Sequence, residues 1–121
     1  MALSDFFKWL PFGKVPELAP EKVLALVTDG SVQILDVRTQ EEWRRSHISG
    51  AMNLPIMHFS RENVGALGLD QQRPVIAVCL SAHRSIPAVR QLKAMGFSEV
   101  YQLESGMRKW WQLGLPCEQP Q

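Results

Sequence analysis

A cysteine and an arginine in the second half of the chain have residue types and a spacing that suit nucleophilic chemistry. In the segment "PVIAVCLSAHRS", Cys79 ends an apolar run, and Arg84 follows five positions later. A neighbouring cation or a helix N-terminus stabilises a thiolate, which is the reactive form of cysteine, and exposed backbone N–H groups can bind an anion. We therefore predict Cys79 and Arg84 as catalytic residues. His83 adds a titratable group to the same loop, and Ser81 and Ser85 add hydroxyl donors, so the loop is predicted to bind an anion.

A simpler interpretation makes Cys79 a packed core thiol, because cysteine is among the most frequently buried residue types. The neighbours of Cys79 argue against this interpretation. The loop that follows it is polar, and an arginine is costly to bury without an anionic partner. The second cysteine, Cys117, lies near the C-terminus. It either exchanges sulfur with Cys79 or is a small residue of the terminal segment, and the second alternative is the simpler one.

Strands and helices that alternate along the chain would position this loop. Strands are predicted over residues 32–37, 51–54, 74–79 and 98–103. Helices are predicted over residues 3–10, from 20 to a stop at 29–30, from a capping box at 39–42, and over 58–67, 84–96 and 105–114. The alternation favours a single α/β domain with a central parallel β-sheet flanked by helices on both faces. Ligands of such sheets bind at the carboxyl ends of the strands, where Cys79 is expected.

Composition and charge narrow the class of protein. The chain has 121 residues, which suits one domain, and its net charge of +1 gives no reason to expect a nucleic-acid partner. It has no apolar run that could span a membrane, and the N-terminus lacks the pattern of a signal peptide. A cytoplasmic location with two free thiols is therefore expected. The cysteines and histidines lack the spacing of metal ligands, so no metal is predicted.

Three segments together resemble rhodanese-like domains, the sulfurtransferase family whose members carry a persulfide on cysteine. The loop after residue 78 resembles the family's C-x-x-x-x-R pattern. "ILDVRTQEEWRRSHISGAMNLP" (34–55) resembles its upstream signature, and "MGFSEVYQLESGMRKWWQLGLP" (95–116) resembles its closing segment. The resemblance implies a rhodanese-like single domain over residues 15–117. An N-terminal amphipathic segment would cover residues 1–14, and a C-terminal tail residues 118–121.

The resemblance also implies an activity. A small anionic sulfur donor, such as thiosulfate or a persulfide on a sulfur-carrier protein, would load Cys79, and a thiol or cyanide would remove the outer sulfur. No cofactor is needed beyond the cysteine persulfide itself. Arg84 would hold the donor or orient the loop. The resemblance also implies that the other residues of the loop bind substrate: Leu80, Ser81, Ala82, His83 and Ser85. The positions that match the family's other signature residues are expected to give structural support, with an ion pair between Arg38 and Glu42: Asp36, Arg38, Glu42 and His47.

Departures from the family pattern leave other functions open. Ala82 stands where many single-domain members have glycine, so either the loop avoids a positive φ or it is strained there. Ser46 and Ser105 also replace glycines, and we interpret both as packing variants. A binding or regulatory module of weak catalytic power is one alternative. A small-oxyanion phosphatase or arsenate reductase is another, which the four-residue spacing between Cys79 and Arg84 disfavours. The apolar segment 1–14 would dock on its own domain, on a second copy or partner, or on a membrane surface.

Overall fold

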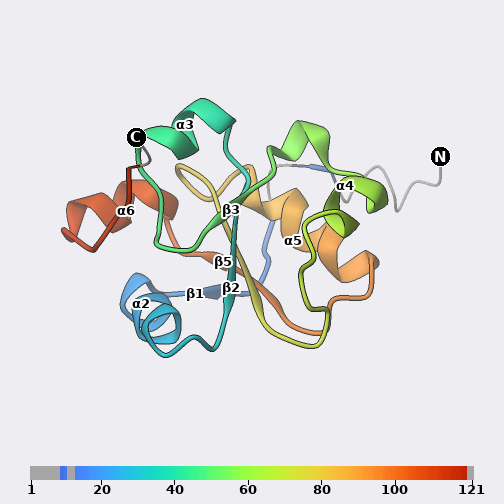
Figure 1. Cartoon of the computed structure of the whole chain (residues 1–121), viewed down its shortest axis with the longest axis horizontal. Helices are drawn as coiled ribbons and strands as arrows, with labels where there is room; N and C mark the ends of the chain where they lie inside the picture. Colours follow the sequence, from blue (N-terminus) through green and yellow to red (C-terminus); the bar gives the residue numbers. More distant parts are fainter. Residues whose placement is uncertain (1–8, 11–12, 120–121) are drawn as a thin grey trace.

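One parallel sheet forms the centre of the molecule, as expected from the alternation of strands and helices. The computed structural model describes residues 9–10 and 13–119 (Figure 1). Five strands within these residues pair in the order β1-β5-β4-β2-β3, and every pair is parallel. Their bounds are β1 Glu17–Leu18, β2 Gln33–Asp36, β3 Met52–Asn53, β4 Val75–Val78 and β5 Val100–Leu103. The short edge strand β1 was not expected from the sequence.

Helices cover both faces of this sheet, which confirms the predicted architecture. In Figure 1, α2 and α6 lie on one side of the strands, α4 and α5 lie on the other, and α3 sits above the carboxyl ends. The helical bounds are α2 Pro20–Thr28, α3 Gln40–Arg45, η1 Ile56–His58, α4 Arg61–Gly65, α5 Ser85–Ala94 and α6 Gly106–Gln112. The predicted helix over residues 3–10 lies almost wholly outside the described residues. Within the part of the chain that is described, no helix has the length and apolarity needed to cross a membrane.

The helix predicted over residues 58–67 is wrong in its extent. The chain forms a short 3₁₀ turn, η1, and then a separate helix, α4. Between them, Ser60 has extended backbone angles, φ −157° and ψ 162°, and its hydroxyl accepts a hydrogen bond from the backbone N–H of Asn63. Ser60 is therefore an N-cap, and a residue in that conformation cannot continue a helix through it.

Two apolar cores lie on opposite faces of the sheet. One joins Leu35, Val75 and Ala77 to residues of α5 such as Leu92, and the other joins Ile34 and Ile76 to α2 and α6. All four residues of β4 are buried. A strand that is covered on both faces has a continuous run of apolar residues rather than an alternating pattern. The sequence "VIAV" is such a continuous run.

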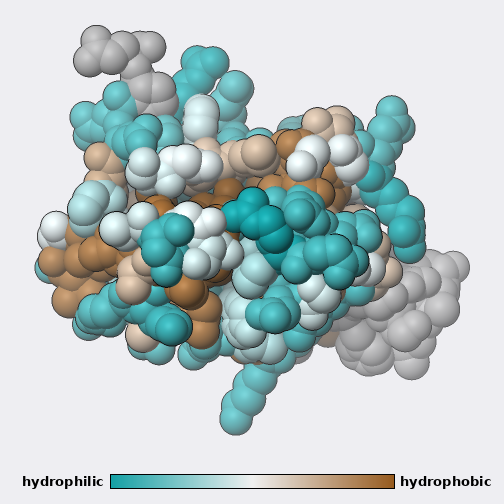
Figure 2. Space-filling view, turned by 60° about the horizontal axis from the view of Figure 1, so that its bottom comes forward, coloured by the Kyte–Doolittle hydropathy of each residue, from teal (hydrophilic) through white to brown (hydrophobic). Residues whose placement is uncertain are grey.

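The amino-terminal end of the sheet carries a hollow lined by both polar and apolar residues. Figure 2 turns the lower side of Figure 1 forward and shows hydrophobic surface running between hydrophilic side chains. A hollow of about 490 Å³ on this side is lined by residues before and within β2 and β3, including Val32, Ile34 and Met52. It opens at the starts of the strands, whereas Cys79 follows the end of β4.

Candidate active site

Cys79 lies directly after β4, at the carboxyl edge of the sheet, with only 1% of its surface exposed. The backbone N–H of His83 donates a hydrogen bond to its Sγ at 3.1 Å. The hydroxyl oxygen of Ser85 lies 3.5 Å from the same sulfur. A hydrogen bond donated to sulfur favours the charged form of a thiol or persulfide over the neutral one. Two of the predicted loop residues, His83 and Ser85, thus lie against the sulfur, and the N–H of His83 points at it.

The start of α6 holds the active-site loop in place. The backbone N–H of Met107 donates to the carbonyl of Cys79 at 2.8 Å, and that of Arg108 donates to the carbonyl of Leu80 at 3.0 Å. Gly106 makes this approach possible, because a Cβ atom at its position would lie 2.4 Å from the Cys79 carbonyl oxygen. Its φ of +61° also disfavours any residue with a side chain.

Ala82 adopts the strained conformation that the sequence had left open. Its φ is +64°, in the left-handed region, where an L-residue other than glycine loses about 1–2 kcal/mol. Ser81 and His83 flank it, and the Ser81 hydroxyl and His83 Nδ1 are 3.0 Å apart. The backbone of the active-site loop is therefore strained at Ala82, next to the residue whose N–H donates to the sulfur.

The two serines that stand where the family has glycine, Ser105 and Ser46, differ in backbone conformation. Ser105 precedes α6 with a φ of +60°, so glycine would relieve strain there. Ser46 has an extended φ of −170° and is unstrained. Its hydroxyl accepts a hydrogen bond from the indole N–H of Trp111 at 3.0 Å, which gives the serine a packing role.

Arg84 precedes α5 and directs its guanidinium to Glu42 of α3. Its Nη1 and Nη2 donate to the two carboxylate oxygens at 2.6 and 3.0 Å. The hydrogen bond from Arg84 lowers the pKa of Glu42 to about 2, although partial burial opposes this shift. The same bond raises the pKa of Arg84. The cation beside Cys79 is therefore already paired with an anion.

The predicted ion pair between Arg38 and Glu42 is wrong. Arg38 precedes Thr39, the N-cap of α3, so the two residues do not share a helix and the i, i+4 geometry does not apply. Arg38 turns back to Asp36 instead, with 2.7 Å between Nη2 and Oδ2, and both side chains are 1% exposed. Its Nη2 also donates to the carbonyl of Ser46 at 2.6 Å.

The buried pair of Asp36 and Arg38 holds the turn from β2 into α3. The Trp111 ring covers the guanidinium, with 5.7 Å between the Arg38 carbon and the ring centroid. The side-chain amide of Asn53 donates to the carbonyls of Asp36 and Arg38 at 3.0 and 2.9 Å. Asn53 was not among the predicted residues. The sequence feature that could have identified it is a polar residue within the short strand predicted over residues 51–54.

His47 follows α3 and joins that helix to the C-terminal segment. Its ring stacks on Trp43 with 4.3 Å between centroids, and its Nδ1 lies 2.7 Å from the Trp43 carbonyl oxygen. Its backbone pairs with Glu118 through hydrogen bonds of 2.9 and 2.7 Å. Among the described residues, no hydrogen bond or ring contact joins His47 to Cys79, and its surroundings are those of a packing residue.

Two polar residues that connect to the sulfur through Ser85, Gln102 and Glu17, were missed by the sequence interpretation. The Ser85 hydroxyl donates to Oε1 of Gln102 in β5 at 2.7 Å, and Nε2 of Gln102 donates to Glu17 of β1 at 3.1 Å. Gln102 is 5% exposed. A buried glutamine in the apolar strand "VYQL" is a usable signal, because buried polar groups need partners.

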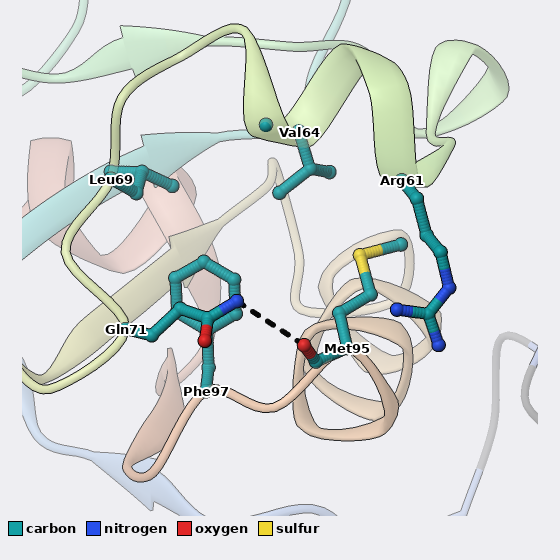
Figure 3. A pocket seen from close by; sticks show the side chains of 7 residues that line it. Arg61, Val64, Leu69, Gln71, Met95 and Phe97 are labelled. Carbon is teal, nitrogen blue, oxygen red and sulfur yellow. Dashed lines mark hydrogen bonds between the residues drawn. The ribbon is translucent and has the colours of Figure 1, made fainter.

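Other hollows lie beside or away from this loop. Arg84 and Pro87 line a recess of about 360 Å³ together with Trp9, Ile56 and Met57, so the described end of the N-terminal segment reaches the neighbourhood of the loop. A smaller pocket of about 110 Å³ lies between α4 and the end of α5 (Figure 3). There the amide of Gln71 donates to the carbonyl of Met95 at 3.3 Å.

Known proteins share both the sequence pattern and the fold of this chain. The family model described as "Rhodanese-like domain" matches residues 19–113. A thiosulfate sulfurtransferase, GlpE, of Stutzerimonas stutzeri is 35% identical over 99 residues, which cover 82% of this chain and 84% of that protein. A putative sulfur carrier protein, YrkF, of Bacillus subtilis is 34% identical over 97 residues, or 79% of this chain. The chain spans only about half of that relative's length, 51%.

The fold comparison agrees with the sequence comparison. The crystal structure of a thiosulfate sulfurtransferase from Pseudomonas aeruginosa superposes with a TM-score of 0.76 at 30% identity. The match covers 88% of this chain and 21% of the larger protein, so the likeness concerns one domain of it. The sheet order, the loop after β4 and these matches lead to one conclusion: the chain belongs to the rhodanese-like domain family.

Proposed function

We propose that this chain is a sulfurtransferase that moves sulfane sulfur from thiosulfate or a persulfide donor to a thiophilic acceptor through a persulfide on Cys79. The observation that carries the proposal is the N–H of His83 aimed at Sγ from 3.1 Å. That donor faces the charge that a thiolate and a persulfide both carry. The names of the relatives, thiosulfate sulfurtransferase and putative sulfur carrier protein, support the same class of reaction.

The proposed reaction has two displacement steps. The Cys79 thiolate attacks the outer sulfur of thiosulfate, the sulfur–sulfur bond of the donor breaks, and sulfite leaves with the bonding electrons. Cyanide or an acceptor thiolate then attacks the outer sulfur of the Cys79 persulfide. The cysteine leaves as a thiolate, and thiocyanate or a new persulfide is released. Both steps conserve charge and electrons, and neither requires a metal or organic cofactor.

Arg84 would act mainly by positioning the loop. Its guanidinium donates two hydrogen bonds to the carboxylate of Glu42, so its charge is largely balanced before the sulfur donor binds. The pair links the start of α5 to α3 and holds the loop between them. The anionic donor would then be bound chiefly by the backbone N–H groups of the loop.

Mass spectrometry tests this function directly. Thiosulfate treatment should add the mass of one sulfur atom to the peptide that contains Cys79, and cyanide should remove it with release of thiocyanate. The variant Cys79→Ser should lose both the adduct and the turnover, whereas the matched variant Cys117→Ser should keep both, because Cys117 is exposed and has no contact with the loop that the structure records. Equal turnover in Cys79→Ser and wild type would refute the proposal.

A binding or regulatory role is the second candidate, favoured by the 1% exposure of Cys79 and the strain at Ala82. A module of this kind would bind a partner but release no thiocyanate. The same assay separates the two functions, because a sulfur adduct without turnover would support the binding role. Turnover of an aryl phosphate or arsenate would instead support the phosphatase or reductase alternative.

A further inference from the structure

The hydroxyl group of Ser85 lies between two acceptors but has a single hydrogen to give. Its oxygen is 2.7 Å from Oε1 of Gln102 and 3.5 Å from Sγ of Cys79. Ser85 is fully buried and Gln102 nearly so, which leaves water little part in this exchange. Whichever acceptor receives the hydrogen, the other faces a lone pair of the same oxygen.

Glu17 decides which acceptor receives it in the resting state. Glu17 of β1 stands opposite Gln102 of β5 in the parallel register, and its carboxylate accepts from Nε2 at 3.1 Å. A carboxylate can only accept, so the amide of Gln102 must turn its nitrogen to Glu17 and its oxygen to Ser85. The Ser85 hydrogen then points to Gln102 and away from the sulfur.

We propose that Gln102, oriented by Glu17, controls how readily Cys79 ionises by competing with the sulfur for the hydroxyl hydrogen of Ser85. While Cys79 is a thiol, its S–H can donate to the Ser85 oxygen. When the thiol loses its proton to solvent, the Ser85 hydroxyl rotates about its Cβ–Oγ bond and donates to the thiolate. No covalent bond of Ser85 or Gln102 changes, and the Gln102 oxygen is left without its donor.

Gln102 is thus a positioning residue of the proposed sulfurtransferase, and the inference rests on Cys79 being its nucleophile. The competition by Gln102 would make the resting chain hold Cys79 as a thiol more firmly than a Ser85 hydroxyl free to donate to the sulfur would. The charged groups around the sulfur are Arg84, which interacts electrostatically with Cys79, and Glu42 and Asp36, which act on Arg84 in turn. The imidazole of His83 is held by Ser81. The substitutions proposed below leave all of these groups in place.

The experiment measures the pH dependence of Cys79 alkylation by iodoacetamide in the full chain. Peptide mass spectrometry separates Cys79 from Cys117, so both thiols stay present. Methionine matches the length of glutamine without its amide oxygen, and Gln102→Met should release the Ser85 hydrogen to the sulfur. A hydrogen bond to a charged acceptor exceeds one to a neutral acceptor, so the alkylation midpoint should fall by about 0.5–1 pH unit.

A double-mutant cycle with Ser85→Ala separates this mechanism from a structural effect. In the Ser85→Ala background the same Gln102→Met change should not move the midpoint, because no hydroxyl remains to be redirected. A shift of equal size in both backgrounds, or no shift in either, would overturn the proposal. Thermal unfolding reports whether each variant folds.

If Gln102→Met does not fold, a second variant tests the same proposal. Glu17→Gln lets the amide of Gln102 turn over and should lower the midpoint in the same direction. Part of that shift should vanish with Ser85→Ala, and its full persistence would count against the proposal. Glu99→Gln, which removes a carboxylate at the opposite end of β5, is the matched control and should leave the midpoint unchanged. Alkylation needs no sulfur donor, so a chain without sulfurtransfer would still give this readout.

Discussion

Replacing Glu42 with glutamine isolates the ion pair that joins α3 to the active-site loop. Glutamine keeps the shape of the side chain and can still complete the capping box with Thr39, so the substitution removes chiefly the charge that Arg84 contacts. In the wild-type chain the two carboxylate oxygens accept from Arg84 at 2.6 and 3.0 Å. The variant should therefore be less stable than wild type at neutral pH.

The size of the loss follows from the pKa of Glu42. A pKa of about 2 in the folded chain, against an ordinary 4.5, is equivalent to about 3 kcal/mol of stability at neutral pH. The side chains of Arg84 and Glu42 are 33% and 31% exposed, so solvent screening reduces this to about 1–2 kcal/mol. Because folding depresses this pKa, the contribution is complete above pH 4.5 and is lost as the pH falls toward 2.

Urea denaturation of both chains between pH 7 and pH 3.5 checks both the size and the sign. The stability gap between wild type and Glu42→Gln should be widest at neutral pH and should narrow by more than about half near pH 3.5. Glu41→Gln is the matched control, since its partner Arg45 lies on the same helix and both side chains are 77% exposed. It should change stability by less than about 0.5 kcal/mol. A Glu42→Gln variant that lowers the free energy of unfolding no more than Glu41→Gln does, or whose loss of stability does not change with pH, would refute the reasoning.

Three further substitutions test the loop and its supports. Ala82→Gly should stabilise the chain against urea by about 1 kcal/mol, because glycine relieves the φ of +64°, and an unchanged midpoint would argue against strain. Gly106→Ala should destabilise the chain by more than about 2 kcal/mol and speed alkylation of Cys79, since the new Cβ would lie 2.4 Å from the Cys79 carbonyl oxygen. Asp36→Asn should cost about 3–5 kcal/mol by leaving the buried Arg38 charge without its carboxylate, and thermal unfolding near that of wild type would contradict this expectation.

Local patterns were sufficient to predict the order of most elements and the place of the loop, although not the strand β1 or the break between η1 and α4. The apolar run "VIAV" predicts a strand covered on both faces, and Thr39 with Glu42 predicts the start of α3. Both signals act between residues that are close in sequence, so the residues themselves carry the information. The strand ends differ from the predicted ones by one or two residues, because the last residues of a strand depend on its neighbours for hydrogen bonds.

The partners of the charged and polar residues could not be predicted in the same way. Arg38 and Glu42 stand four apart, which suggests a helical pair, yet the helix begins only after Thr39. The partner of Glu42 is Arg84, 42 residues away, and a contact of that kind exists only once the fold brings the loop before α5 beside α3.

The sequence by itself determined an α/β domain of the rhodanese-like family and a cysteine at the carboxyl end of a buried strand, because both follow from local periodicity and short motifs. Only the tertiary structure decided what surrounds that cysteine. The register of β1 with β5 brings Glu17 to Gln102, and the packing of α5 on the sheet brings Ser85 between Gln102 and the sulfur. The approach of α6 to the loop gives Gly106 its steric constraint. These contacts join residues that are distant in the chain, so their geometry is set by strand order and helix packing rather than by any local pattern.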